Sequence, residues 1–435
     1  MSAAEQGRNI AYRAFRFPAD LADGTVLGVR CADDGLVLGS LPARLAHTDP
    51  HTGAHVRYDV GRWVSPPVRV GFPVHQVVPS WTADTPDGCW LQVEVCGWAD
   101  DAPVTGWYVL ARWAAGDEGL RRTSVPGQRD RQAEVDTDTL TATGSRLTGW
   151  QLRVTLARPA GGTDRPVLRT VGAVASGHRS ADAAGPAADP PAAPAGHAGH
   201  GPAGHGPAGH GPAGHVTAAP AGGTVDGGVP AARGTVLAVP TFSQRVHAGH
   251  YPRWGGGGDS WCSPTCTAMV LAFWAAGPAP DEYAWVDPAD PRPTVDHAAR
   301  HCYDHAYRGA GNWAFNTAYA GRYGMAAFVT RLRSLAEAER FVAAGIPLVV
   351  STAFRVGDVP GLDYDTRGHL IVLVGFTADG DPVLNDPYAP DDDGVRRIVD
   401  RSRFEAAWQR GSGGMVYVIR PPSVPLPPPP AQPNW

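Results

Sequence analysis

The segment GGGGDSWCSPTCTAMVLAFW, residues 255–274, places Cys262 just before an apolar stretch with helical spacing. In this stretch the apolar residues are spaced at i, i+3, i+4 and i+7, which predicts a helix with one buried stripe. These residues are Cys266, Met269, Val270 and Phe273. Pro264 fits the first turn of that helix, so Cys262 lies at its N-terminus. The free N–H groups and partial positive charge there stabilise a thiolate, and the preceding glycines let a substrate backbone come close. We predict that Cys262 is a nucleophile and that Cys266 is a small core residue.

A nucleophilic cysteine needs a base, and the base needs a group that orients it. His369 opens the apolar strand in RGHLIVLVGF, and the turn ADGD leads to a returning strand that ends VLNDP. Asp386 therefore returns to the end of the hairpin that holds His369. Pairing about the turn leaves Asp386 a few residues short of His369, so we expect a bulge or an irregular turn. Asn385 points to the opposite face and competes for the orienting role.

The chain that must position these groups has four predicted parts. Residues 1–175 contain short alternating strands separated by turns, which predicts an all-β sandwich. Residues 176–235 are a low-complexity segment with AGHGP repeats, which predicts a disordered linker and two folded parts that move independently. Residues 236–421 contain helical patterns at 263–277, 294–307 and 334–345 followed by strand patterns, which predicts an α+β domain. Residues 422–435 are proline-rich and predicted to be extended or disordered.

Two further clusters of side chains have alternative interpretations. Six aromatic residues of the first part form either its core or a sugar-stacking face, and we favour the core: Trp81, Trp90, Trp98, Trp107, Tyr108 and Trp113. The linker histidines either capture metal or are incidental to a tether, and we favour the tether: His200, His205, His210 and His215.

A third histidine cluster has helical spacing. His297, His301 and His305 lie at i, i+4 and i+8, with Cys302 nearby, a pattern that could hold zinc. No glutamate stands in the position of a metalloprotease base, so we favour a structural role for this face and predict no metal ligands and no cofactor.

Composition narrows the functional classes. The 435 residues have a net charge of −5, which argues against nucleic-acid binding, and all 37 basic residues are arginines. A chain without lysine excludes a lysine phosphate loop and a Schiff base. No run of 18 apolar residues occurs, so we expect no membrane insertion. The six cysteines are sparse, and most of them are predicted to be free thiols. The start lacks a signal-peptide pattern, so we expect a cytoplasmic protein as the sequence stands.

Residues 240–421 resemble the bacterial papain-like cysteine peptidases of the bacteriocin-leader-processing type, peptidase family thirty-nine, in their "-like" branch. The matching stretches are FSQ (242–244), GGGGDSWCSPT (255–265), GAGNWAFNTAYAGRYG (309–324), AAGIPLVVS (343–351), GHLIVLVGFTADGDPVLNDP (368–387) and GGMVYVI (413–419). The resemblance implies a papain-like fold, with Cys262 as nucleophile, His369 as base and Asp386 as orienter. It also implies that Gln244 donates to the oxyanion. Its distance from Cys262 in the sequence exceeds the family's usual gap, so an insertion containing the glycines must loop out.

The resemblance extends to the other parts of the chain. Residues 1–175 look like the β-sandwich that precedes such domains in actinobacterial proteins, and relatives are often exported, so an extracellular location is the alternative. We expect a cysteine peptidase or amidase that acts on peptides or proteins. The alternatives are a transpeptidase or cell-wall amidase that uses the same site, and a non-catalytic protein on a peptidase scaffold. The first part has a carbohydrate or cell-surface ligand as its candidate partner.

Overall fold

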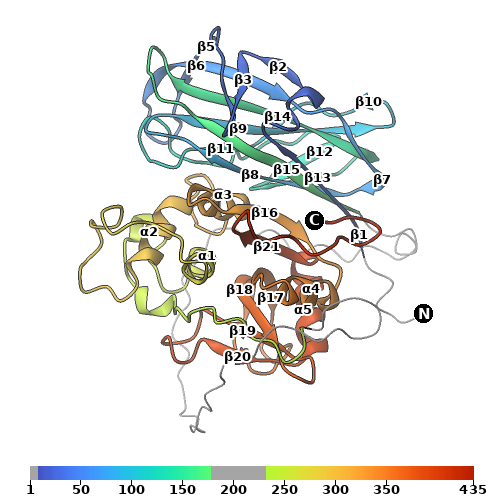
Figure 1. Ribbon diagram of the computed structural model, residues 1–435, viewed down its shortest axis with the longest axis vertical. Coiled ribbons are helices and arrows are strands. Elements are labelled where there is room, and N and C mark those ends of the chain that lie inside the picture. The colour runs from blue at the N-terminus through green and yellow to red at the C-terminus, as the bar shows by residue number, and fades with distance from the viewer. Residues whose placement is uncertain (1–7, 145, 178–231) are drawn as a thin grey trace.

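The N-terminal part consists of two antiparallel sheets (Figure 1) in the computed structural model, which describes residues 8–144, 146–177 and 232–435. The seven-stranded sheet contains β1 (Asn9–Arg16), β3 (Val29–Ala32), β4 (Gly35–Leu38), β8 (Gln76–Asp84), β12 (Ala133–Asp136), β13 (Thr139–Ala142) and β15 (Val167–Gly177). The eight-stranded sheet contains β2 (Thr25–Leu27), β5 (Ala43–Thr48), β6 (His55–Val64), β7 (Val68–Val74), β9 (Trp90–Ala99), β10 (Ala102–Pro103), β11 (Tyr108–Trp113) and β14 (Leu147–Pro159). Apolar side chains of both sheets share one core, as the alternating pattern of the strands requires.

Most of the six aromatic residues singled out in this part lie in its core. Four of the six are buried in the core region: Trp81, Trp90, Tyr108 and Trp113. The two partly exposed ones are engaged by neighbours. Trp98 Nε1 donates to Gln151 Oε1 at 3.2 Å, and the Arg153 guanidinium lies 4.4 Å from the centre of the Trp107 ring. The core interpretation therefore holds for the four buried rings.

The C-terminal part is an α+β unit built on a six-stranded sheet in the order β16-β21-β17-β18-β19-β20. Its strands are β16 (Ala326–Arg331), β17 (Leu348–Phe354), β18 (Thr366–Phe376), β19 (Pro382–Asn385), β20 (Arg396–Ile398) and β21 (Met415–Arg420). The described residues form five α-helices: α1 (Cys262–Phe273), α2 (Pro293–Cys302), α3 (Trp313–Arg322), α4 (Leu335–Ala343) and α5 (Arg401–Ser412). The three expected helices are α1, α2 and α4, whereas α3 and α5 were not predicted.

Helix α3 packs directly against β8 and joins the two parts. A Cβ atom on Gly321 would lie 2.8 Å from the Thr82 side chain, so only glycine permits this close approach. One turn and a half earlier, the Phe315 ring contacts Trp113 and Trp81, with ring centroids 5.1 and 6.2 Å apart. Apolar residues of both parts therefore form one continuous core.

Polar contacts fix the same interface. The buried Arg122 donates to the carbonyl of Arg300 at 2.7 Å and pairs with Asp117 at 2.6 Å. Asp304 accepts the N–H of Ser124 at 3.0 Å. The expectation of independently moving parts is therefore wrong, because a buried interface fixes their relative position. The linker, with its predicted disorder and its histidines, lies outside the described residues.

The proline-rich C-terminus is extended and packed rather than disordered. Asn434 is fully buried and donates to the carbonyl of Arg331 at 2.7 Å, while the buried Trp435 ring contacts Phe341 at 4.9 Å. The N–H of Tyr12 donates to the carbonyl of Pro433 at 3.2 Å. The tail thus connects β1 of the first part to β16 and α4 of the second.

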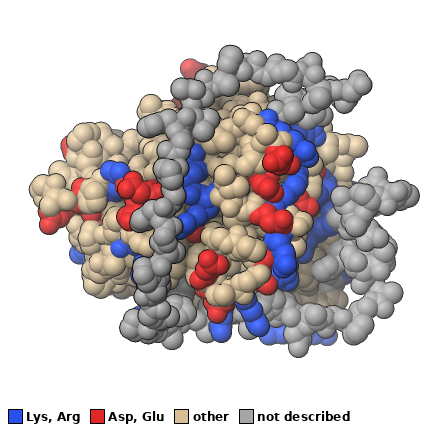
Figure 2. Space-filling view, turned by 90° about the horizontal axis from the view of Figure 1, so that it is seen from below, with Lys and Arg blue, Asp and Glu red and all other residues tan. Residues whose placement is uncertain are grey.

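Charges of both signs mix at the surface of the C-terminal part. Figure 2 shows basic and acidic side chains interspersed on the face seen from below. Among the residues that the structure describes, no helix is both long and apolar enough to span a membrane.

Candidate active site

Helix α1 presents Cys262 at its first residue, as the sequence predicts. The preceding Trp261 is fully buried and anchors the helix start through a hydrogen bond from Nε1 to the Trp254 carbonyl at 2.8 Å. No side chain caps the first turn. The Cys262 thiol is partly exposed and is a hydrogen-bond partner of His369. Cys262 is therefore not closed off from solvent, and its side chain lies beside the imidazole.

Asp386 holds His369 from the other side of the ring. His369 Nε2 lies 2.8 Å from Asp386 Oδ1, which also accepts the backbone N–H of Tyr388 at 3.1 Å. The second oxygen, Oδ2, accepts the Tyr364 hydroxyl at 3.0 Å. Because Asp386 engages Nε2, the nitrogen that faces Cys262 is Nδ1. The rings of Tyr364 and Tyr388 both meet the imidazole edge to face and limit its rotation.

Electrostatics favour the charged forms of both His369 and Asp386. Burial alone would lower the pKa of His369, but the hydrogen bonds to Asp386 and Cys262 outweigh it and raise the pKa to about 10. Burial alone would raise the pKa of Asp386, yet the hydrogen bonds from His369, Tyr388 and Tyr364 lower it below the usual value. The geometry thus stabilises an imidazolium between a carboxylate and the sulfur.

The hairpin of β18 and β19 contains the expected irregularity. Val372 pairs with Asn385 and Leu373 with Leu384, and the register then shifts before Gly375. Asn385 points away from His369, and its Nδ2 donates to the carbonyl of Pro240 at 3.0 Å. Asp386 rather than Asn385 therefore contacts the imidazole.

A second cysteine fixes the distance between the helix and the strand. Cys266 is fully buried, and its thiol donates to the Leu370 carbonyl at 3.2 Å. Burial raises its pKa well above the usual value, so it remains a neutral thiol. All six cysteines are free, in line with the prediction for most of them.

Gln244 lies on the loop that leads into the site. Its side chain is fully buried, and Nε2 donates to the carbonyl of Gly258, four residues before Cys262. Its N–H donates to the Pro387 carbonyl at 2.8 Å, next to Asp386. Residues 245–257 form the expected excursion and contain two short 3₁₀ helices, Arg245–His247 and Pro252–Trp254. The side-chain amide of Gln244 has two N–H donors. Only one of them is needed for the hydrogen bond to the Gly258 carbonyl, so the other can donate elsewhere.

The three helically spaced histidines do not share one face. Helix α2 ends at Cys302, so His305 lies beyond it. His297 bonds the Tyr319 hydroxyl at 2.9 Å, and His301 bonds the carbonyl of Ala115 in the first part at 2.7 Å. Burial lowers the pKa of His297 to about 3, so the ring is neutral. Two of the histidines are packing residues, in line with the structural interpretation.

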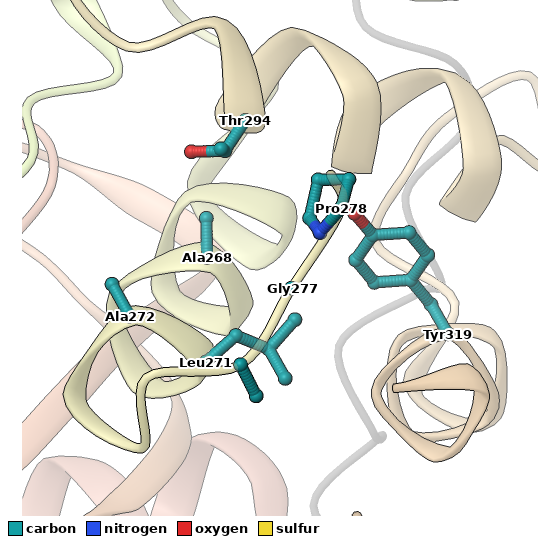
Figure 3. Close-up of a pocket in the computed structure, with 8 residues that line it drawn as sticks. Ala268, Leu271, Ala272, Gly277, Pro278, Thr294 and Tyr319 are labelled. Atoms are coloured by element: carbon teal, nitrogen blue, oxygen red, sulfur yellow. The ribbon is translucent and has the colours of Figure 1, made fainter. Parts of the chain in front are cut away.

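A small cavity lies beside α1, and Cys262 is not among the residues that line it (Figure 3). Its volume is about 50 Å³. Most of its lining is apolar and comes from α1, the following turn, α2 and α3: Ala268, Leu271, Ala272, Ala276, Gly277, Pro278, Thr294 and Tyr319. Space of this size holds a few water molecules and is too small for a peptide.

Comparison with known protein families gives a match for each of the two parts of the chain. Residues 11–176 match the family model "Peptidase C39 N-terminal domain", and residues 236–415 match the model "Peptidase_C39 like family". No curated protein matches the chain.

Two solved structures are similar in part. One is described as a C39-like peptidase from Bacillus anthracis, with 19% identity, 42% of this chain and 97% of that chain covered, and a TM-score of 0.28. The other is the carbohydrate-binding module TmCBM61 in complex with β-1,4-galactotriose, with 10% identity, 39% and 91% coverage, and a TM-score of 0.16. Both TM-scores are below 0.5, so the assignment of the two parts to C39 peptidase families rests on the family models alone.

Proposed function

Because this chain joins a peptidase C39 N-terminal domain to a domain of the C39-like peptidase family, we propose that it is a cysteine peptidase or amidase. Cys262 is the nucleophile, His369 the general base and acid, and Asp386 the positioning residue. The observation that carries the proposal is the contact of the imidazole with Asp386 at 2.8 Å on one side and with the Cys262 thiol on the other. This is the arrangement that acyl transfer to sulfur requires.

The first half of the reaction forms a thioester. His369 Nδ1 takes the thiol proton, and the Cys262 sulfur attacks the carbonyl carbon of the scissile amide. The resulting oxyanion accepts the Cys262 backbone N–H and the second N–H of Gln244. When the tetrahedral intermediate collapses, His369 returns the proton to the leaving amine.

The second half releases the acid. His369 takes a proton from water, the hydroxide attacks the thioester carbon, and the C–S bond breaks with return of the proton to Cys262. Peptides and proteins are the proposed substrates. Transfer of the acyl group from the thioester to an amine instead of water would make the same residues a transpeptidase. Adding an amine nucleophile and measuring its acylated product tests for this reaction.

Alkylation of Cys262 by iodoacetamide across pH tests the pairing directly. We expect the wild-type chain to react at pH 6 nearly as fast as at pH 8, and His369→Ala to react only as pH approaches about 8.5, like a free thiol. Cys31→Ser, which removes a partly exposed thiol elsewhere, is the matched control. If wild type and His369→Ala share one profile, the protein is a non-catalytic member of the family. Digestion of a peptide library with Cys262→Ala as blank then identifies the cleaved bonds.

A further inference from the structure

Four potential metal ligands converge on one point beside the loop that connects Gln244 to Cys262. His247 and His250 lie on that loop, Asp290 lies just before α2, and Asp296 lies in its first turn. One ligand atom from each residue lies within 4.8 Å of all the others. Two stretches of chain about forty residues apart therefore direct nitrogen and oxygen atoms to the same place.

The separations match a small tetrahedral site. His247 Nδ1 lies 2.9 Å from Asp296 Oδ2 and 3.6 Å from Asp290 Oδ2. His250 Nδ1 lies 3.0 Å from Asp296 Oδ1 and 3.1 Å from Asp290 Oδ2. Ligands at about 2.0–2.1 Å from a zinc ion in tetrahedral geometry lie about 3.3 Å apart. The four nitrogen–oxygen distances, which involve both oxygens of Asp296, bracket that value, and the His250–Asp296 contact is also a hydrogen bond.

Buried polar atoms at this point lack partners of their own. His247 and Asp296 are fully buried, and the Asp290 side chain is 1% exposed. His247 Nδ1 and Asp296 Oδ2 form no hydrogen bond despite their 2.9 Å separation, and Asp290 Oδ2 likewise has no partner. These three buried atoms therefore approach one another without a hydrogen bond of good geometry, which leaves them available to a common ligand. Asp290 Oδ1 accepts the Arg292 N–H at 2.7 Å and so holds the carboxylate in place.

Charge at this point fits a divalent cation. With both imidazoles neutral as metal ligands, the two carboxylates would carry two negative charges, and burial of unpaired charge is unfavourable. A divalent cation balances both charges and satisfies all four ligand atoms. We propose that His247, His250, Asp290 and Asp296 bind a divalent metal ion of the zinc class at a closed structural site. With four protein ligands and no open position, the ligand set fits a structural rather than a catalytic zinc, although structural zinc sites more often contain cysteine.

The ion would pin the loop that leads into Cys262. Gly257 adopts a φ of +68°, and a Cβ atom there would lie 1.8 Å from the His247 carbonyl oxygen. The glycine run therefore packs directly against the backbone of a ligand. Binding at the cluster joins this loop to α2 and to the segment containing Asp290, independently of whether the thiol is catalytic.

Metal content of the full chain tests the proposal. The linker histidines are expected to bind metal weakly, so the parent protein carries Gln in place of the five histidines at 197, 200, 205, 210 and 215. After dialysis against Zn²⁺ and then metal-free buffer, we expect one equivalent of Zn²⁺ per chain. Replacement by Co²⁺ is expected to give the intense visible absorption of four-coordinate cobalt with nitrogen and oxygen ligands.

Variants separate this site from incidental binding. Asp296→Asn and His250→Gln are expected to lose the equivalent of Zn²⁺ and the cobalt band, whereas Asp287→Asn, an exposed neighbour, keeps both. His250 is one-third exposed, so its variant reports on the site even if the buried Asp296 variant fails to fold. A parent protein that retains no Zn²⁺, or an unchanged cobalt band in His250→Gln, overturns the proposal in favour of protonated histidines paired with the two aspartates.

Discussion

Asp386 contacts His369 through Oδ1 at 2.8 Å and the Tyr364 hydroxyl through Oδ2 at 3.0 Å. One carboxylate thus orients the imidazole while a phenol orients the carboxylate. The Tyr364 hydrogen bond is also one of the interactions that lower the pKa of Asp386.

Removal of the Tyr364 hydroxyl is expected to slow catalysis without destroying the site. For Tyr364→Phe we predict a roughly tenfold lower kcat with KM little changed, since a hydrogen bond to a charged group contributes about 1.5 kcal/mol. The pKa of Asp386 should rise, so activity on the acid side is lost at a higher pH. Tyr388→Phe is the control because Tyr388 reaches Asp386 through its backbone N–H. Equal pH profiles for the two variants would contradict this role.

Arg122 is expected to hold the two parts together. In Arg122→Ala, Asp117 loses its fully buried partner and the Arg300 carbonyl loses its donor, so we predict a loss of about 3 kcal/mol in the free energy of unfolding. Arg121→Ala removes a partly exposed pair to the same Asp117 and should cost at most about 1 kcal/mol. Urea denaturation measures both. If both variants lose the same free energy of unfolding, the buried Arg122 contributes no more to stability than the partly exposed Arg121.

Asp138 makes the same interface sensitive to pH. It accepts the Trp313 N–H at 2.8 Å, and burial raises its pKa to about 7. The folded chain therefore holds this proton between its unfolded pKa near 3.9 and about 7, and stability falls as pH rises through that window.

Asp138→Asn should abolish this dependence. The amide oxygen still accepts the Trp313 N–H, so we predict a variant that matches wild type near pH 4 and is more stable on the order of 4 kcal/mol above pH 7. Unfolding at both pH values provides the comparison, and Asp136→Asn, an exposed neighbour, serves as control. A constant difference between wild type and Asp138→Asn would refute the raised pKa.

The last residue is expected to stabilise the fold. Trp435 is buried against Phe341, and its Nε1 donates to the Pro427 carbonyl at 2.8 Å. We predict that Trp435→Ala lowers the free energy of unfolding by about 2 to 3 kcal/mol. The exposed Pro428→Ala should change it little. A melting curve unaffected by Trp435→Ala would mean that the tail only rests on the surface.

The catalytic candidates were visible in the sequence because each stands at the edge of a strong local pattern. Cys262 opens an apolar helix and His369 opens an apolar strand, so periodicity alone places them. The choice of Asp386 over Asn385 depended on the register of one hairpin. That register contains the predicted irregularity and leaves Asn385 on the Pro240 carbonyl.

Features that depend on distant contacts were missed. Helix α3 contains Asn316, Thr317 and Gly321, which weaken its helical signal, and it is stabilised by packing on β8. Helix α5 carried readable signals: Asp400 accepts the Arg403 N–H at 2.8 Å, and Gly413 ends the helix in a left-handed conformation.

The His247 cluster had no comparable local signal. Its two histidines are separated by two residues, but their aspartate partners lie about forty residues further on, in no periodic pattern. Only the tertiary fold brings them together.

Because the buried interface sets the relative position of the two parts, the length of the AGHGP repeats does not need to set it. Gly177 and Ala232 both belong to folded segments whose mutual position is already set by α3, β8 and Arg122. The sequence between them connects two points that are fixed without it. Repeats can therefore be gained, lost or cut without altering the distance between Cys262 and His369, and a chain cleaved within them should still purify as a single particle.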